Sequence, residues 1–309
     1  MPDVLLRAAL LERGYTSADL ERLLREGSLT RLRRGAYAWP AGELSPEASH
    51  ALLIASTWAQ LRTTATVSHV SAAVLHGLPV WAAQLDRVHV TRPRTGGGKA
   101  RRLLQIHTSV LAATDVVELG GMTATSLART TADLGRSLPL EQAVAAADAA
   151  ARLGLDSRSV LEVLQRCSGW PGVARGLLVA RLADRRSESV GESVSRVRMH
   201  QAGLPAPTPQ FVVHGDDGRF LARCDFGWPG LGVLGEFDGR VKYGRLLAPG
   251  ADPGEVVHRE KLREDALRDR GWRVVRWTWP DLYAGDVLVD RLRRALHSRR
   301  DAAEAPFRR

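Results

Sequence analysis

The chain has 309 residues, enough for two or three domains, and carries a formal net charge of +10 with a pI near 10.6. The excess is arginine, whose planar fork matches phosphate, so nucleic acid is the first partner to consider, although an arginine-rich genome would produce the same composition. Two widely separated cysteines without metal-ligand spacing predict neither a disulfide framework nor a zinc site, and no apolar run is long enough to cross a membrane. A cytoplasmic protein without a membrane partner is expected.

The first 45 residues are predicted to form a small winged-helix-like DNA-binding domain. Residues 4–13 place apolar side chains at helical spacing, and Gly14 ends the helix. Thr16 or Ser17 can cap a second helix, after which LTRLRRGAYAW alternates like a strand, a turn and a return strand. Two helices and a basic wing suit docking on DNA through three arginines of the wing: Arg31, Arg33 and Arg34. The pattern also fits two simple hairpins with solvated arginines.

Residues 46–185 make up the second predicted region, which is mostly helical. The serines and histidines around His69 and His76 are residue types that can act as a nucleophile and a base in catalysis. No acid lies nearby in sequence to orient a histidine. The apolar stripe around them predicts instead that both histidines form hydrogen bonds at a helix end or in the core. RVHVT (87–91) and LQIHT (104–108) alternate like strands around a basic loop, whose GGGK lacks the spacing of a phosphate-binding P-loop.

Two stretches of this half of the chain resemble one family. The N-terminal segment, in which a glycine and a helix are followed by RLRRGAYA, resembles a known family. It is similar to the winged-helix domain of antitoxins and transcriptional regulators of the abortive-infection, type IV toxin–antitoxin class. The stretch TVSHVSAAVLHGLPVW (66–81) resembles the middle region of the same proteins. The resemblance implies DNA binding and a cognate toxin as a partner, and it implies no catalysis.

Residues 186–300 are predicted to be an α/β domain with a helix, three strands, a helix, a strand and a final helix, followed by a basic tail at 301–309. Within it, FLARCDFGWPGLGVLGEFDGRVKY (220–243) has the pattern of two strands around a Gly-Pro turn. Acids interrupt the apolar strands, which is costly unless they are paired or hold a cation. A turn of two or four residues would set Asp225 opposite Leu234 and gather three acids on one face, whereas a three-residue turn would scatter them.

The region from about Ser189 to Leu296 resembles a family related to the very-short-patch repair endonuclease, within the PD-(D/E)XK nuclease superfamily. Several motifs carry the resemblance in one order, namely GES, GLPxPxxQ at 203–210, CDFGWP, GEFDG and KLREDALRDRGWRVVRWTW at 261–279. The resemblance implies a restriction-endonuclease-like α/β fold and Mg²⁺, or Mn²⁺, as the cofactor of phosphodiester hydrolysis. The expected fold class of the whole chain is therefore multidomain α/β.

The resemblance also assigns roles to individual residues. Asp225 and Glu236 match the metal-binding acids, and Glu192 matches a helix glutamate that completes the metal shell, although helical periodicity places Glu192 on the surface. Asp238 stands where the superfamily often has lysine. Two lysines could supply the missing cation, and two arginines could hold flanking phosphates; these are Lys242, Lys261, Arg263 and Arg276.

Together these patterns predict a DNA-binding protein with a metal-dependent endonuclease-like domain that hydrolyses phosphodiester bonds. The alternative is an antitoxin-like transcriptional regulator whose nuclease fold is catalytically inactive.

Overall fold

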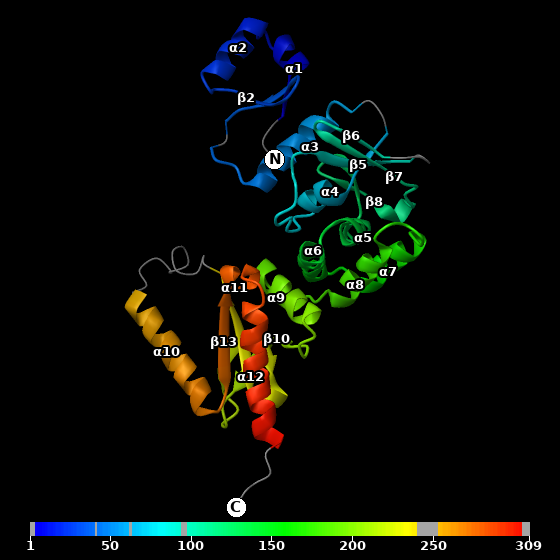
Figure 1. The fold of residues 1–309 in the computed structure, drawn as a ribbon. Helices are drawn as coiled ribbons and strands as arrows, with labels where there is room; N and C mark the ends of the chain where they lie inside the picture. The colour runs from blue at the N-terminus through cyan, green and yellow to red at the C-terminus, as the bar shows by residue number, and fades with distance from the viewer. Residues whose placement is uncertain (1–3, 41, 62–63, 94–97, 240–252, 305–309) are drawn as a thin grey trace, which may run out of the picture. The chain divides into compact units, whose positions relative to one another are not determined.

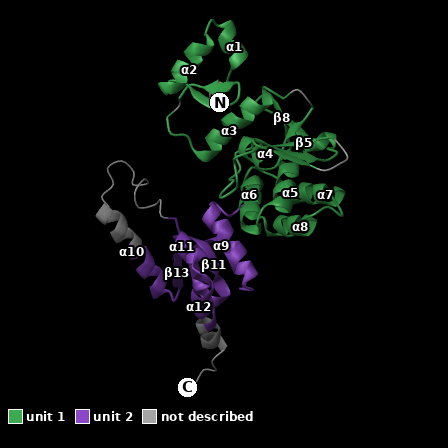
Figure 2. Cartoon of the chain, turned by 45° about the horizontal axis from the view of Figure 1, so that its top comes forward, with its two compact units in different colours: residues 1–183 green, residues 184–309 purple. Residues whose placement is uncertain are grey.

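The computed structural model describes residues 4–40, 42–61, 64–93, 98–239 and 253–304. The chain divides into two compact units, residues 1–183 and 184–309, and each combines helices with β-sheet (Figures 1 and 2). The predicted multidomain α/β fold class is therefore confirmed. None of the helices in the described residues has the length and apolar character needed to span a bilayer.

The first unit begins with β1 (Leu5–Leu6), α1 (Arg7–Glu12), α2 (Ser17–Arg25), β2 (Thr30–Arg33) and β3 (Ala36–Ala38). The strands form a sheet in the order β1-β3-β2. The prediction of a helix from residue 4 was wrong at its start, because Leu5 and Leu6 pair with β3 before the helix begins. Thr16 caps α2 as predicted: its hydroxyl accepts a hydrogen bond from the Asp19 backbone N–H, and the Asp19 carboxylate accepts one from the Thr16 backbone N–H.

A six-stranded mixed sheet in the order β6-β7-β5-β4-β9-β8 forms the centre of this unit, so the middle region holds more strand than predicted. One face of the sheet packs on α3 through a core that includes Ile54, Val67, Val90 and Ile106. The elements are α3 (Pro46–Trp58), β4 (Thr66–Val67), α4 (His69–Leu75), β5 (Val88–Arg92), β6 (Lys99–Arg101), β7 (Leu104–Thr108), the 3-10 helix η1 (Ala113–Asp115), β8 (Val116–Leu119) and β9 (Met122–Thr125).

Four helices complete the first unit: α5 (Leu127–Ser137), α6 (Leu140–Arg152), α7 (Ser157–Arg166) and α8 (Val173–Leu182). Helix α5 is the central one, since it contacts the other three and also α4. Gly135 of α5 faces Gly176 of α8, and a Cβ on Gly135 would come within 3.1 Å of the Gly176 Cα. The two glycines therefore let the helices approach closely.

The second unit contains α9 (Val190–Gln201), β10 (Thr208–His214), β11 (Phe220–Trp228), the 3-10 turn η2 (Pro229–Leu231), β12 (Val233–Asp238), α10 (Pro253–Asp269), β13 (Arg273–Thr278), α11 (Trp279–Tyr283) and α12 (Val287–Glu304). The predicted order of helix, three strands, helix, strand and helix is confirmed, with the short α11 added. The sheet order is β10-β11-β12-β13. The first three strands are antiparallel, and α10 is the crossover that makes β13 parallel to β12.

Helices cover both faces of this sheet (Figure 1). On one face the indole N–H of Trp277 donates to Ser195 of α9, and Phe226 stacks on Trp277. On the other face Leu267 of α10 packs with Cys224 and its neighbours. Because Phe226 and Cys224 are two residues apart yet face opposite sides, the alternation of β11 is interrupted at Asp225, between them.

Candidate functional site

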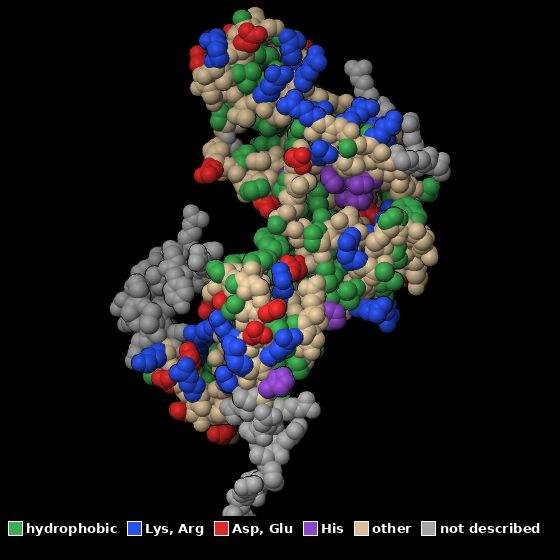
Figure 3. Space-filling model, in the orientation of Figure 1, with side chains coloured by type: hydrophobic (Ala, Val, Ile, Leu, Met, Phe, Trp, Pro, Cys, Tyr) green, Lys and Arg blue, Asp and Glu red, His purple; other side chains and the backbone are tan. Residues whose placement is uncertain are grey.

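The predicted basic wing forms, but its three arginines differ in environment. Arg31 and Arg34 are exposed, whereas the Arg33 guanidinium donates to the Thr57 hydroxyl of α3 over 2.6 Å. Burial lowers the pKa of Arg33 from its usual value. Arg33 therefore anchors the wing to α3, and the outward cations are Arg31 and Arg34. Lys and Arg side chains gather along one edge of the N-terminal unit in Figure 3.

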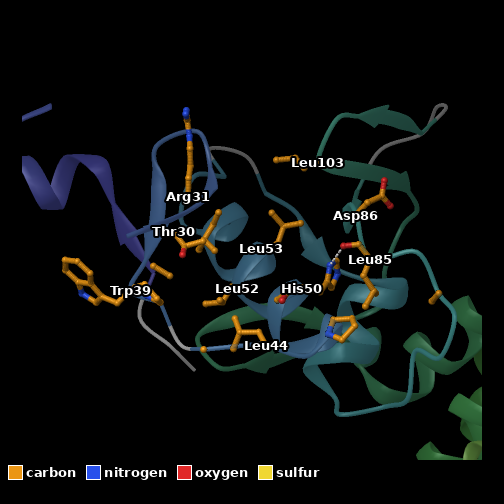
Figure 4. Close-up of a pocket in the computed structure, with 17 residues that line it drawn as sticks. Thr30, Arg31, Trp39, Leu44, His50, Leu52, Leu53, Leu85, Asp86 and Leu103 are labelled. Atoms are coloured by element: carbon orange, nitrogen blue, oxygen red, sulfur yellow. Dashed lines mark hydrogen bonds between the residues drawn. The ribbon is translucent and has the colours of Figure 1, made fainter. Parts of the chain in front are cut away.

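A cavity of about 770 Å³ lies between the wing and α3, and most of its lining is apolar (Figure 4). His50 of α3 lies on its wall, where its Nδ1 is 2.8 Å from the Leu85 carbonyl and its Nε2 is 2.9 Å from the Ser71 hydroxyl. Both ring nitrogens thus have protein partners. Arg31 belongs to the rim and extends away from the cavity.

The sequence left the register between the two strands open, and in the structure Asp225 does not lie opposite Leu234. Strand β11 continues to Trp228, which pairs with Val233, and this moves the turn and sets Gly227 opposite Leu234. The ladder between the two strands ends at Phe226, just before the irregularity at Asp225. Beyond that point the Asp225 carboxylate accepts a hydrogen bond of 2.7 Å from the Phe237 backbone N–H. The side chain of Asp225 therefore replaces the backbone carbonyl as the acceptor at this place between the strands.

Glu236 is buried, with 9% of its surface exposed, and both of its carboxylate oxygens accept hydrogen bonds from arginine. Oε1 accepts from Arg263 of α10 at 2.8 Å, and Oε2 accepts from Arg276 of β13 at 2.9 Å. Cys224 lies beside Glu236. Burial, and then the adjacent Glu236 carboxylate, raise the pKa of the Cys224 thiol to about 12. The predicted phosphate-binding arginines therefore neutralise the predicted metal ligand.

Glu192 is buried, with 6% of its surface exposed, so the surface position inferred from periodicity was wrong. It lies in the first turn of α9, where the Ser189 hydroxyl donates to its Oε1 at 2.7 Å and the Glu188 backbone N–H donates to its Oε2 at 2.9 Å. The Gln210 amide also donates to Oε2, at 2.8 Å. Glu192 is buried because it satisfies polar groups at the start of the helix, a role that apolar periodicity does not detect.

Contacts connect the three acids across neighbouring elements. Gln210 of β10 donates to Glu192 and so connects α9 with β10. The residues on either side of Gln210 pair with Phe226 and Cys224, which places Gln210 level with Asp225 of β11. Its φ of +52° is rare for a residue other than glycine. Such strain is found most often at ligand or functional sites.

In this structure the carboxylates of the three acids already accept hydrogen bonds from protein groups. Mg²⁺ needs carboxylate oxygens that can turn toward one ion, and those of Glu236 already accept from arginine. Among the described residues, the acids of the second unit form no group of three with ligand atoms within 4.8 Å of one another. Asp238 is half-buried at the end of β12, Lys261 is exposed on α10, and Lys242 lies outside the described residues.

A different cluster, made of His69, His89 and His107, lies in the first unit. It is the one group of three or more potential metal-binding side chains in the part of the chain that the structure describes, with ligand atoms all within 4.8 Å of one another. The rings of His69 and His107 stack with their centroids 3.6 Å apart, and His107 Nε2 is 3.1 Å from His89 Nδ1. We call these residues the histidine trio.

A buried ionic network borders the histidine trio. Arg129 of α5 is 3% exposed and donates to Asp133 at 2.9 Å and to Asp115 at 3.2 Å. Burial by itself disfavours the charged guanidinium, but the adjacent Asp133 carboxylate raises the pKa of Arg129 above its usual value. Arg136 also donates to Asp133, at 3.2 Å, and stacks over Trp170. The network joins α5 to Asp115 of η1 and to Ser109, which follows β7.

Sequence reasoning placed His69 in the core or at a helix end and missed the partnership with His89 and His107. The prediction for His76 is confirmed, because its Nε2 lies 2.8 Å from the Thr125 carbonyl just beyond the end of α4. One feature of the sequence indicated the histidine trio: both predicted strands, RVHVT and LQIHT, carry a histidine. Their pairing as parallel neighbours, which brings the histidines together, was not predictable from either strand alone.

Comparisons with known proteins add little about function. No protein-family model matches the chain. Two proteins of Mycobacterium tuberculosis, named Uncharacterized protein MT2308 and Uncharacterized protein Rv2248, are each 31% identical to it over 177 residues. That alignment covers 57% of this chain and 58% of each relative, so the chain spans less than two thirds of their length. The crystal structure of the RV2827C protein of the same organism aligns with 69% of this chain and 84% of that one, at 17% identity and a TM-score of 0.39, which carries no inference.

Proposed function

We propose that the protein is a DNA-binding regulator of the antitoxin-like class, whose C-terminal unit keeps an endonuclease-like fold without hydrolysing phosphodiester bonds. DNA binding is supported by the wing, where Arg31 and Arg34 stand exposed beside α2 while Arg33 fixes the wing to α3. A rigid strand pair that presents arginines outward suits contact with a phosphate backbone. A cognate toxin is the protein partner that this class implies.

The observation that carries the proposal over the nuclease alternative is the double ion pair of Glu236. A buried carboxylate that accepts from Arg263 and Arg276 is already charge-balanced, and a cation approaching it would have to displace both arginines. Asp238 adds a further negative charge at the position where lysine would balance the charge that develops on a scissile phosphate. This arrangement balances the buried charge of Glu236 and leaves the acids without the environment that hydrolysis needs.

A binding experiment tests the DNA-binding part. The full chain should protect a discrete site in its own upstream DNA, and replacing Arg31 and Arg34 with alanine should weaken binding and flatten the salt dependence. Losing two phosphate contacts reduces the slope of log K against log salt by about 2. Arg158→Ala is the matched control, because Arg158 is an exposed arginine on α7 far along the chain from the wing. Equal affinity and equal slope in the wing variant and the control would contradict the role of the wing.

The second candidate is a metal-dependent endonuclease, and one observation favours it. Glu192, Asp225 and Glu236 lie on adjacent elements that are linked through Gln210 and the Phe237 backbone. In that case Arg263 and Arg276 would leave Glu236 for the phosphates of bound DNA.

Incubation with supercoiled plasmid in Mg²⁺ or Mn²⁺ separates the two candidates. The regulator should leave the plasmid as intact as the variant with Asp225→Ala and Glu236→Ala does. Nicking by the wild-type chain that disappears in this double variant would establish the endonuclease and overturn our first proposal.

A further inference from the structure

The histidine trio lies where three neighbouring strands of the six-stranded sheet come together. His69 follows β4, His89 belongs to β5 and His107 belongs to β7, and these strands are adjacent in the order β7-β5-β4. We propose that the trio binds a divalent transition metal, with zinc as the ion whose ligand preferences it fits best. This site lies in the first unit, and the proposal is independent of the function proposed above.

The spacing of the ring nitrogens is close to that of a zinc centre. Two imidazole nitrogens bound to one tetrahedral zinc at about 2.0–2.1 Å are roughly 3.3–3.4 Å apart. His107 Nε2 and His89 Nδ1 are 3.1 Å apart, and one ligand atom of His69 lies within 4.8 Å of both. The rings of His69 and His107 are stacked, so binding one ion requires rotation about the side-chain bonds that turns their nitrogens toward a common point.

The protonation state of the trio also suits a metal. Burial, and then repulsion from a neighbouring positive charge, lowers the pKa of His89 and of His107 to about 4, and burial holds the pKa of His69 well below its usual value. Neutral imidazoles at pH 7 offer the lone pairs that a metal requires. A set of nitrogen ligands favours Zn²⁺ and its transition-metal neighbours, whereas Mg²⁺ and Ca²⁺ prefer oxygen.

Groups around the trio hold it in place. The Ser68 hydroxyl is 3.1 Å from His69 Nδ1 and accepts a hydrogen bond from the Thr91 hydroxyl at 2.9 Å. By accepting the Nδ1 proton, Ser68 would leave Nε2 of His69 as the ligating atom, since a metal-bound histidine donates its other ring N–H to a neighbouring acceptor. His69 also adopts a φ of +54°, a strained backbone conformation at the first position of α4. Strain of this kind is found most often where a side chain must be aimed at a ligand.

One side of the trio is open. A cavity of about 230 Å³ is lined by His69, His107, Ser109 and Arg136, and histidine side chains reach the surface of this unit as one patch in Figure 3. The arginines closest to the cavity, Arg129 and Arg136, both donate to Asp133, which offsets their repulsion of a cation. Three protein ligands with an open fourth position leave room for water or a small anion on the metal.

Metal titration of the chelator-treated full chain tests the proposal. We expect Zn²⁺ to bind at one ion per chain, and Co²⁺ to bind at the same site with the visible absorption of a four-coordinate ion. His107→Gln should weaken Zn²⁺ binding by at least about tenfold, since even the loss of an outer-shell partner has that effect. His214→Gln, which changes an exposed histidine of the other unit, should bind as the wild type does.

A gain-of-signal variant keeps the test decisive if His107→Gln fails to fold. His107→Cys should retain Co²⁺ and add the near-ultraviolet charge-transfer band of a thiolate ligand, which neither the wild type nor His214→Gln shows. If the wild type takes up neither Zn²⁺ nor Co²⁺, the trio is a hydrogen-bonded network and the proposal fails. It also fails if His107→Gln binds with unchanged affinity, or if the cysteine variant binds Co²⁺ without the band.

Discussion

Replacing Arg129 with methionine should strongly destabilise the first unit. The guanidinium is 3% exposed and lies between two buried carboxylates, Asp115 and Asp133, while its third nitrogen donates to the Ser109 hydroxyl. Removing one partner of a buried pair costs about 3–5 kcal/mol, because it leaves an uncompensated charge away from water. Asp115 keeps Arg166 and Asp133 keeps Arg136, so we expect a loss near the lower end, about 3 kcal/mol.

Urea unfolding of the full chain gives the change in the free energy of unfolding, and hydrogen exchange of the α5 amides assigns it to the first unit. Arg158→Met on α7 is the control, since its side chain is exposed and should change stability by less than about 0.5 kcal/mol. Adding Asp133→Leu to Arg129→Met should recover part of the loss, because an apolar pair needs no charge balance. If Arg129→Met lowers the free energy of unfolding by less than about 1 kcal/mol, the ion pairs of Arg129 do not stabilise the first unit as we expect.

The chelator-treated protein should lose stability as the pH falls from about 6.5 toward 4, and show no such change above 6.5. In the folded chain the pKa values of His89 and His107 are about 4, whereas in the unfolded chain they are about 6.5. Below pH 6.5 the unfolded chain therefore binds protons that the folded chain does not. At pH 5 this lowers the free energy of unfolding by about 2 kcal/mol per histidine. Urea midpoints across this range that do not depend on pH would contradict the burial of neutral imidazoles. In the second unit, Gly191→Ala should cost about 1–3 kcal/mol, because the new Cβ would lie 1.9 Å from the Phe237 ring. Gly230→Ala meets no atom within 4 Å and should leave the thermal midpoint unchanged, and equal midpoints for the two variants would refute the packing argument.

Local patterns in the sequence determined which elements form. The capping residue Thr16, the strands that contain His89 and His107, and the element order of the second unit all follow from spacings of two to four residues along the chain. The same rules failed where a residue answers to a distant part of the chain. Glu192 was assigned to the surface because its helical angle ignores the hydrogen bonds that it forms at the start of α9 and with Gln210.

Tertiary structure alone decided the environment of every candidate site. Glu236 is neutralised by arginines 27 and 40 residues away in sequence, which depends on how α10 crosses over and on the register between β12 and β13. The histidine trio exists because β4, β5 and β7 are neighbours in the sheet, although they are separated along the chain. Residue spacing encodes the face of a helix or strand, but strand order and ion pairing are settled by the packing of the whole unit. The sequence by itself therefore determined the elements and the candidate residues, and only the fold decided which of them meet.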